Sequence, residues 1–254
     1  MLFELTNTSA AAPLFDGWEE TLIWSCLQGV MGKIYADDAK HPASAIAVNG
    51  DFIFFAGKAD TSLVSCQSKQ CTKPFMILVP QTERWQEAIL QYYGESAQLV
   101  SRYAIKKEPD IFDTDKLEKI IASLPTTYTL SMIDQTLYEM CRSQAWSADL
   151  VSQFPDSESF CTLGLGVVVC QNGTVVSGAS SYSRYDGGIE IEIDTRPDCR
   201  RQGLALVCGA KLILECLKKN LYPSWDAQNK ASVALAEKLG YHYSYTYPAI
   251  EIRR

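Results

Sequence analysis

The stretch from Ile189 to Ala205, IEIEIDTRPDCRRQGLA, restricts the possible folds more than any other part of the chain. Apolar and acidic residues alternate strictly over residues 189–195, and a β-strand is the only regular element with a period of two. Pro197 marks a turn, and an apolar stripe at helical spacing then runs from about Arg201 to Lys219. The sequence therefore predicts a strand, a tight turn and an amphipathic helix in direct succession.

The turn between this strand and this helix has the composition of an anion-binding site. The first turn of a helix leaves backbone N–H groups unpaired, and the helix dipole adds partial positive charge there. Gly203 lacks a Cβ and Ala205 is small, so a phosphate can approach the backbone closely. Arg200 and Arg201 can add charge-assisted hydrogen bonds. Taken alone, this spacing is a weak signal, because it also fits a helix start with two solvated arginines.

The rest of the second half alternates between strand and helix patterns. Asn172-Gly173 lies between two apolar runs, which is a strong hairpin signal. The predicted elements are a strand over 128–133, one or two helices over 135–154, a hairpin over 163–179, a strand over 189–195, a helix over 201–219, a strand over 221–226, a helix over 230–239 and a strand or hairpin over 241–252.

The first half also mixes strands and helices, and it contains a second hairpin signal at Asn49-Gly50. A charged segment, KKEPDIFD, reads as a linker. The predicted elements are a helix over 19–28, a hairpin over 44–56, a strand over 75–79, a helix over 83–93, a strand over 98–105 and a helix over 113–124. We expect two domains, residues 1–125 and residues 126–254.

Three stretches carry a resemblance to a known superfamily. Arg200-x-x-Gly203-x-Ala205 resembles the coenzyme A signature of the GNAT superfamily, Q/R-x-x-G-x-G/A. Downstream, WDAQN and the residues from Ser232 to Gly240 resemble the next motif, in which an Asn caps a helix and a Gly-aromatic pair ends it. More narrowly, EIDTRPDCRRQGLA and PSWDAQNKASVALAEKLGY resemble the family of the zwittermicin A resistance acetyltransferase. The resemblance extends over most of the chain and is strongest over residues 160–245.

The resemblance implies an α/β (α+β) GNAT fold, with a mixed central sheet in which two neighbouring parallel strands splay apart between flanking helices. It implies that residues 126–254 form the acetyltransferase domain and that residues 1–125 form a degenerate GNAT-like half, since they lack the signature. Acetyl-coenzyme A would bind between the strands at 189–195 and 221–226. The residues that the resemblance assigns to the cofactor are Ile193, Asp194, Thr195, Arg200, Arg201, Gln202, Gly203, Leu204, Ala205, Asn229 and Ser232.

Acetyl transfer to an amine also needs proton transfer. An amine must be neutral to attack a thioester, and lysine-like amines have a pKa of about 10.4, so a base is required. Glu192 and Glu190 lie on the polar face of the strand and are the candidates, although a solvated strand face is the alternative. Many relatives carry a Tyr in the last helix as the acid, but Ala236 stands at that position here. Tyr241 and Tyr243 are the first candidate replacements, and Tyr245 and Tyr247 are the alternatives.

The composition restricts the kinds of partner that we expect the protein to bind. The net charge of −7 and the pI near 5.0 disfavour nucleic acid and anionic membranes, and they suit a cationic amine. The amino-terminal residues have no basic n-region, and no apolar run approaches 18 residues, so we expect a cytoplasmic protein without a membrane span. Nine scattered cysteines and two distant histidines, His41 and His242, predict reduced thiols and no metal site.

Three functions follow from these patterns. The leading one is an N-acetyltransferase, of the acyltransferase class, that acts on a primary amine of a small molecule. A protein or peptide N-acetyltransferase is the second. The third is a non-catalytic acyl-coenzyme A sensor or interaction module, which the alanine at position 236 favours. We expect a monomer or a homodimer.

Overall fold

The computed structural model describes residues 2–70 and 74–253, and the chain divides into two compact units. Unit 1 comprises Met1–Arg102 and Thr246–Arg254, and unit 2 comprises Tyr103–Tyr245. Strands β6 (Ala97–Ile105) and β13 (Tyr243–Arg253) each begin in one unit and end in the other.

This division differs from the predicted boundary at residue 125 in two places. Helix α4 (Thr114–Ala122) belongs to unit 2, where it packs on α7 (Leu204–Lys218) and buries Leu117 completely. The carboxyl-terminal part of β13 belongs to unit 1, where Ile250 to Arg253 pair with β5. Linear sequence patterns do not show either of these long-range contacts.

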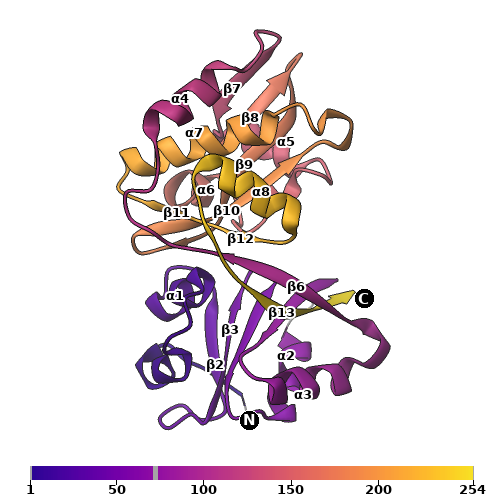
Figure 1. The fold of residues 1–254 in the computed structure, drawn as a ribbon. Helices are drawn as coiled ribbons and strands as arrows, with labels where there is room; N and C mark the ends of the chain where they lie inside the picture. The colour runs from indigo at the N-terminus through magenta and orange to yellow at the C-terminus, as the bar shows by residue number, and fades with distance from the viewer. Residues whose placement is uncertain (1, 71–73, 254) are drawn as a thin grey trace. The chain divides into compact units, whose positions relative to one another are not determined.

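Unit 1 contains a mixed sheet in the order β1-β2-β3-β4-β5-β13-β6, to which β6 contributes residues 97–102. The pair β4·β5 is parallel, whereas β1·β2, β2·β3, β3·β4 and β5·β13 are antiparallel. Helix α1 lies on one face, and α2 and α3 cover the other (Figure 1). Its further elements are β1 Phe3–Glu4, 3₁₀ turns at Thr8–Ala10 and Ala12–Phe15, α1 Thr21–Gln28, β2 Lys33–Ala36, β3 Ser44–Asn49, β4 Phe52–Gly57, α2 Thr61–Gln70, β5 Phe75–Pro80, α3 Glu83–Tyr93 and a 3₁₀ turn at Gly94–Ser96.

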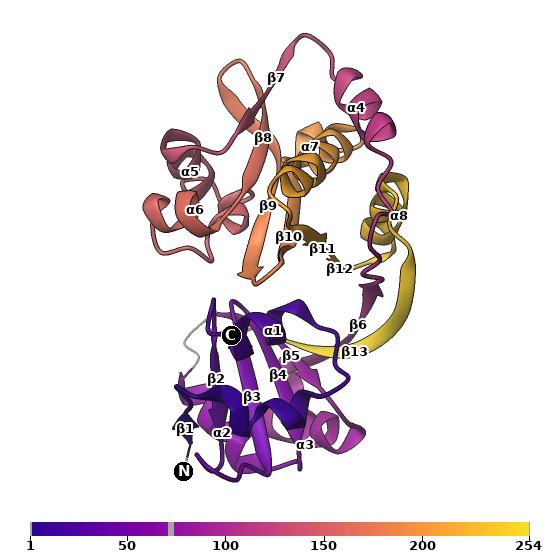
Figure 2. The same ribbon diagram turned by 90° about the vertical axis from the view of Figure 1, so that its left-hand side faces the viewer.

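Unit 2 contains a five-stranded sheet in the order β11-β10-β9-β8-β7, in which only β10·β11 is parallel among the pairs described. Helix α7 covers one face, and α5 and α6 lie on the other (Figure 2). Its further elements are β7 Tyr128–Met132, α5 Gln135–Arg142, a 3₁₀ turn at Ala148–Leu150, α6 Ser157–Leu163, β8 Gly166–Gln171, β9 Thr174–Tyr185, β10 Gly188–Thr195, a 3₁₀ turn at Pro197–Cys199, β11 Tyr222–Ser224, β12 Asp226–Ala227 and α8 Lys230–Leu239.

Both predicted hairpins are present. Asn172 and Gly173 form the second turn with φ of 51° and 75°, as a type I′ turn requires. The first turn uses Gly50 and Asp51, because Asn49 still pairs with Phe52. The strongest local signals therefore predict the correct strand pairs.

The amphipathic helix of unit 2 forms the main core with the sheet beneath it. Leu204, Val207 and Ala210 of the predicted stripe are buried against β8, β9 and β10, whereas the far face carries the ion pairs of Glu215 with Lys211 (2.7 Å) and Lys218 (2.9 Å). The buried side chains hold α7 across the sheet, which fixes its amino terminus beside the end of β10.

Several predicted bounds need correction. Helix α7 begins at Leu204 rather than Arg201, because residues 197–203 form a 3₁₀ turn and a left-handed bend. Leu163 ends helix α6, which the sequence did not predict, and β8 begins at Gly166. The strand expected over 221–226 is two short strands, β11 and β12, that pair with different partners. Strands β1 and β2 and helix α2 were also not predicted.

Candidate active site

The parallel strands β10 and β11 part half-way along β10. Their ladder consists of Gly188↔Tyr222, Ile189↔Pro223 and Glu190↔Ser224. After Ser224 the chain turns away from β10. Asp226 and Ala227 then pair with the end of β6 that belongs to unit 2. Strand β10 continues to Thr195 and keeps only β9 as a strand partner in the described register. One edge of β10 therefore has no strand partner after Glu190, as the splayed-strand prediction requires.

Hydrogen-bond alternation determines which backbone groups point to this edge. Arg196 N donates to Val176 O, so Asp194 and Glu192, two and four residues earlier, also bond to β9. The N–H and C=O groups of Ile193 and Thr195 consequently point away from β9. Those of Thr195 bond to the side chains of Asp194 and Arg200, so the backbone groups of Ile193 are the ones that face a ligand. An extended ligand that offers amide groups can pair with this edge in the manner of an added strand.

The two faces of β10 differ in chemistry, as predicted. Ile189, Ile191 and Ile193 face α7, where Thr195 Oγ1 also lies 2.7 Å from Ser177 Oγ. Glu190, Glu192 and Asp194 lie on the opposite face, toward the side that carries α5 and α6. Ser180, which pairs with Glu192, donates its hydroxyl to Leu150 O on that side. The face of the sheet beside the open edge is therefore acidic.

The turn that leads from β10 into α7 presents its backbone to an anion. Arg201 and Gly203 have φ of 61° and 82°, and alternating left-handed residues direct successive N–H groups into one concavity. Gly203 is the N-cap residue of α7 and makes no side-chain cap, whereas α3, α4, α5, α6 and α8 are all capped by a side chain. A Cβ built at Gly203 meets no atom within 4 Å. Gly203 is thus not required by internal packing, and the space beside it can admit a phosphate.

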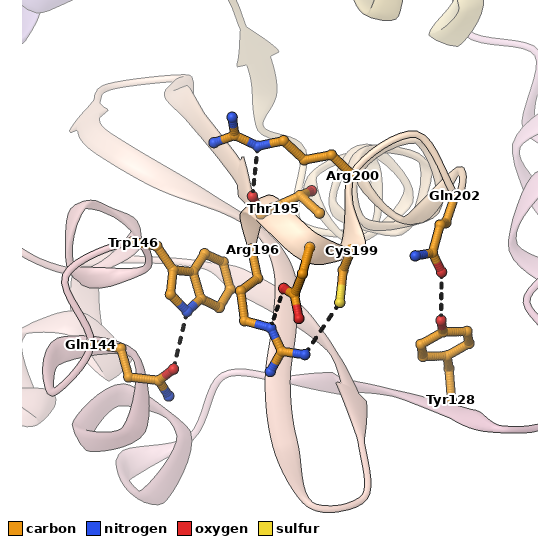
Figure 3. A network of polar contacts seen from close by, with 9 residues as sticks. Tyr128, Gln144, Trp146, Thr195, Arg196, Cys199, Arg200 and Gln202 are labelled. Atoms are coloured by element: carbon orange, nitrogen blue, oxygen red, sulfur yellow. Dashed lines mark hydrogen bonds and ion pairs between the residues drawn. The ribbon is translucent and has the colours of Figure 1, made fainter.

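Polar contacts hold this turn in place (Figure 3). Arg196 donates to Asp198 Oδ1 (2.7 Å) and to Cys199 Sγ (3.3 Å), and the bond to Arg196 lowers the pKa of Asp198. Tyr128 Oη on β7 donates to Gln202 Oε1 (2.8 Å). These bonds fix the loop before its left-handed residues and between them.

The two signature arginines lie at the surface beside the open edge. Arg200 Nε donates to Thr195 O (3.1 Å; Figure 3). Arg200 Nη2 lies 3.5 Å from Asp194 Oδ1. Asp194 also accepts a hydrogen bond from Thr195 N (2.6 Å). Arg201 is exposed. Positive charge is therefore present at the phosphate end of the edge.

The remaining residues assigned to the cofactor have structural roles as well. The side chain of Leu204 is buried and Ala205 is half-buried, so they can offer a ligand mainly backbone N–H groups. Asn229 caps α8 by accepting from Ser232 N (3.0 Å), and Ser232 Oγ accepts from Trp225 Nε1 (3.1 Å). The exposed amide of Asn229 lies directly after β12, where the second strand has turned away.

The candidate tyrosines are placed very differently. Tyr241 is buried, its hydroxyl donates to Pro223 O (2.6 Å), and burial raises its pKa well above the ordinary value. This geometry makes Tyr241 a core residue. Tyr243 is 40% exposed at the start of β13. Ala236 is fully buried in α8, so the position that carries tyrosine in many relatives holds no acid here.

Sequence reasoning missed one pair of hydroxyl groups at this site. Tyr185 Oη and Ser224 Oγ lie 2.9 Å apart and are buried where β10 and β11 part. Burial raises the pKa of Tyr185 to about 12. Tyr185 and Ser224 are 39 positions apart in the sequence, so no local pattern predicts their contact. The register of the strands brings them together.

Among the described residues, no group of three or more His, Cys, Asp or Glu side chains could hold a metal ion. Cys71 of the CQSKQC stretch lies outside the described residues. No described helix has the length and apolar character that a membrane span needs.

Parallel strands that part in front of an uncapped helix are the arrangement that the sequence predicts for an acyl-coenzyme A-dependent acyltransferase. Comparison with known proteins supports the same class. The profile of the GNAT acetyltransferase family matches residues 12–250, and the chain belongs to that family. It is an acyltransferase enzyme, and acetyl-coenzyme A is the cosubstrate typical of its fold.

Individual relatives resemble almost the whole chain. An uncharacterized N-acetyltransferase of Bacillus subtilis, YdfB, is 27% identical over 95% of both chains. The crystal structure of a GCN5-related N-acetyltransferase-like protein from Streptococcus suis is 47% identical, covers 97% of this chain and 98% of its own, and has a TM-score of 0.91. A GCN5-related N-acetyltransferase from Kribbella flavida is 15% identical over 96% and 93% of the chains, with a TM-score of 0.52, and shows the fold alone.

Proposed function

We propose that this enzyme transfers an acetyl group from acetyl-coenzyme A to a primary amine of a small molecule. The observation that carries the proposal is the open edge of β10, which leads directly to the uncapped amino terminus of α7. An edge for amide pairing and a concavity for phosphate lie in one line, and a coenzyme A arm contains both kinds of group.

The residues present fit this cosubstrate. The backbone of Ile193 faces the open edge, and the N–H groups around Gly203, Leu204 and Ala205 face the phosphate end. Arg200 and Arg201 supply positive charge there, and Gln202 shapes the turn through Tyr128. Asp194 holds Arg200, and Asn229 and Ser232 lie at the start of α8, shortly after β12. When bound, acetyl-coenzyme A supplies an acyl group activated as a thioester.

The acidic face of β10 supports an amine acceptor. Glu190 and Glu192 point to the side of the sheet away from α7, beside the open edge. One of these carboxylates can accept the proton that the acceptor amine must lose before it attacks. We propose Glu192 first, because it is half-buried, whereas Glu190 is only 7% exposed. Tyr243 remains the exposed candidate for an acid.

The small-molecule acceptor rests on two supports. The net charge of −7 favours a cationic partner over nucleic acid or an anionic surface. The resemblance of residues 192–205 and 223–241 to the zwittermicin A resistance acetyltransferase family suggests an antibiotic-like amine. A protein or peptide acceptor is the alternative within the same chemistry.

Calorimetric titration with acetyl-coenzyme A, followed by thiol-release assays on small amines and lysine peptides, tests the proposal. We expect saturable binding, and turnover with at least one small amine and not with the peptides. Turnover with the lysine peptides alone would identify the acceptor as a protein or peptide instead of a small molecule. Absence of any binding would contradict the proposal as a whole.

A second candidate function has one specific observation in its favour. Ala236 is fully buried where many relatives carry a tyrosine, so the chain lacks the usual acid. A non-catalytic acyl-coenzyme A sensor would retain Gly203 and the arginines and lose the acid. Tight binding without turnover on a broad panel of amines would favour this second function.

A further inference from the structure

A long-range hydrogen bond ties the turn before α7 to the strand at the far end of the unit 2 sheet. Tyr128 is the first residue of β7, and its Oη donates to Gln202 Oε1 (2.8 Å; Figure 3). Gln202 stands between Arg201 and Gly203, the two left-handed residues of the turn. The bond therefore fixes a side chain in the middle of the turn that forms the anion concavity.

The direction of this bond determines which end of the Gln202 amide a ligand can meet. A glutamine amide offers one oxygen acceptor and carries two N–H donors on its nitrogen. The oxygen accepts from Tyr128, and Figure 3 shows the nitrogen turned away from the phenol. Among the residues that the structure describes, none accepts a hydrogen bond from Gln202 Nε2. Its N–H groups can therefore donate to a ligand.

The turn places this amide beside the position that a phosphate would take. A phosphate that accepts from the backbone N–H groups of Gly203 and Leu204 lies next to the residue that precedes them. Gln202 is exposed, and no atom lies within 4 Å of a Cβ built at Gly203, so a ligand has access to both. The opposite amide orientation would turn the amide oxygen toward the anion. The bond to Tyr128 favours the orientation that presents donors.

We propose that Tyr128 is a positioning residue, which orients the Gln202 amide so that its nitrogen donates to a phosphate of bound coenzyme A. The inference rests on the proposed function and adds to it a neutral, directional contact with the phosphates. A glutamine side chain loses conformational entropy when a ligand orders it. Because Tyr128 orders Gln202 before the ligand arrives, less entropy is lost on binding.

A double-mutant cycle on coenzyme A affinity tests the proposal without knowledge of the acceptor. Tyr128→Phe removes only the phenol oxygen, and Gln202→Ala removes the amide. We expect each change to raise the Kd for coenzyme A, measured by calorimetry, about two- to tenfold, as the loss of one hydrogen bond would. Because Tyr128 acts through Gln202, the double variant should bind no more weakly than Gln202→Ala. If the two effects multiply instead, the inference is overturned.

The side-chain amide of Gln202 gives a spectroscopic readout that a merely structural role would not change. Its two N–H signals in a ¹H–¹⁵N spectrum are the pair that Gln202→Ala lacks. On addition of coenzyme A, we expect one of the two hydrogens to move downfield and to exchange more slowly with water. Tyr128→Phe should reduce both changes. Signals that stay in place while the wild type binds coenzyme A would contradict the proposal.

A matched control separates this effect from a general loss of stability. Tyr138 also lies in unit 2, on α5, and its Oη donates to Phe154 O (2.8 Å). Because Tyr138 is fully buried, Tyr138→Phe should lower stability more than Tyr128→Phe and still keep the wild-type Kd. If the wild type does not bind coenzyme A, the proposed function fails. If it binds and Tyr128→Phe has the same Kd, the inference is overturned and the proposed function stands.

Kinetics adds a further readout once an accepted amine is identified. A contact with the phosphates is the same in the ground state and in the transition state, so its loss raises KM and not kcat. We expect Tyr128→Phe to raise the KM for acetyl-coenzyme A and to keep kcat within about twofold of the wild type. A fall in kcat at unchanged KM would assign Tyr128 to the chemical step and exclude the positioning role.

Discussion

The two units contain the same strand–helix–strand arrangement and treat its edge in opposite ways. In unit 1, β4 and β5 are parallel neighbours joined through α2 and followed by α3; in unit 2, β10 and β11 are joined through α7 and followed by α8. The unit 1 ladder continues to Phe55↔Pro80, and Gln81 N then donates to Phe55 O. The unit 2 ladder ends at Glu190.

Side chains close the edge of β4 in unit 1. Gly57 N donates to Gln81 Oε1 (2.8 Å), and Gly57 O accepts from Trp85 Nε1 (3.0 Å). The Gln81 amide also donates to Leu14 O (2.7 Å). A primary amide and an indole thus take the hydrogen bonds that an extended ligand would make with this strand.

The helix starts differ in the same way. At the start of α2, Asp60 Oδ1 accepts from Ser62 N (2.8 Å), so a carboxylate of the chain itself occupies the anion position. At the start of α7, Gly203 offers no side chain and two arginines lie nearby. The shared topology therefore offers a possible binding site in each unit. The side chains at that site determine whether it can bind a ligand. We therefore expect one acetyl-coenzyme A for each chain.

The largest expected effect is at Gly203. Gly203→Val places a branched side chain at φ 82° and fills the space beside the uncapped helix. Calorimetry should show acetyl-coenzyme A affinity reduced more than 100-fold, with stoichiometry falling from one to zero. Residual binding of one equivalent would reveal a second site in unit 1 and would break the comparison.

Gly173→Val is the matched control for backbone strain. Gly173 has φ 75° and nothing within 4 Å of its missing Cβ, but it lies in the β8–β9 turn. The free energy of unfolding should fall by a similar amount in both variants, on the order of 1–3 kcal/mol. Only the Gly203 variant should lose cofactor binding.

The second effect concerns the acidic face of β10. Glu192→Gln keeps the shape of the side chain and removes the base, so kcat should fall about 10²-fold or more. The Kd for acetyl-coenzyme A should stay within about twofold of the wild type. Glu215→Gln, on the outer face of α7, serves as the control that retains activity. A fall in kcat for Glu190→Gln alone would transfer the role to Glu190.

Local chemistry explains which features of the sequence were predictive. The alternation over 189–195, the stripe of α7 and the Asn172-Gly173 turn depend on neighbours in the chain, and all three are present. The splayed strands were expected only through the family resemblance. The pairing of β12 with β6, the return of β13 to unit 1 and the Tyr185–Ser224 contact depend on partners far along the chain. No local pattern encodes such partners.

A third, smaller effect should appear in unit 1 alone. Gln81→Ala removes the bonds to Gly57 and Leu14, and water can replace them in part because Gln81 is exposed. We expect a loss of about 1 kcal/mol in the free energy of unfolding, measured with urea. The Kd and stoichiometry for acetyl-coenzyme A should not change. A second equivalent of bound ligand would show that Gln81 blocks a second binding site in unit 1.

The smallest effect should come from the anion position of unit 1. Asp60→Ala removes the side-chain acceptor at the start of α2 and should cost about 0.5–1 kcal/mol in unfolding free energy. Asp113→Ala, which removes the equivalent bond to Lys116 N at the start of α4, should cost a similar amount. Neither change should alter acetyl-coenzyme A binding, because Gln81 and Trp85 still close the edge of β4. If Asp60→Ala and not Asp113→Ala raised the stoichiometry above one, the carboxylate itself would be what separates the two units.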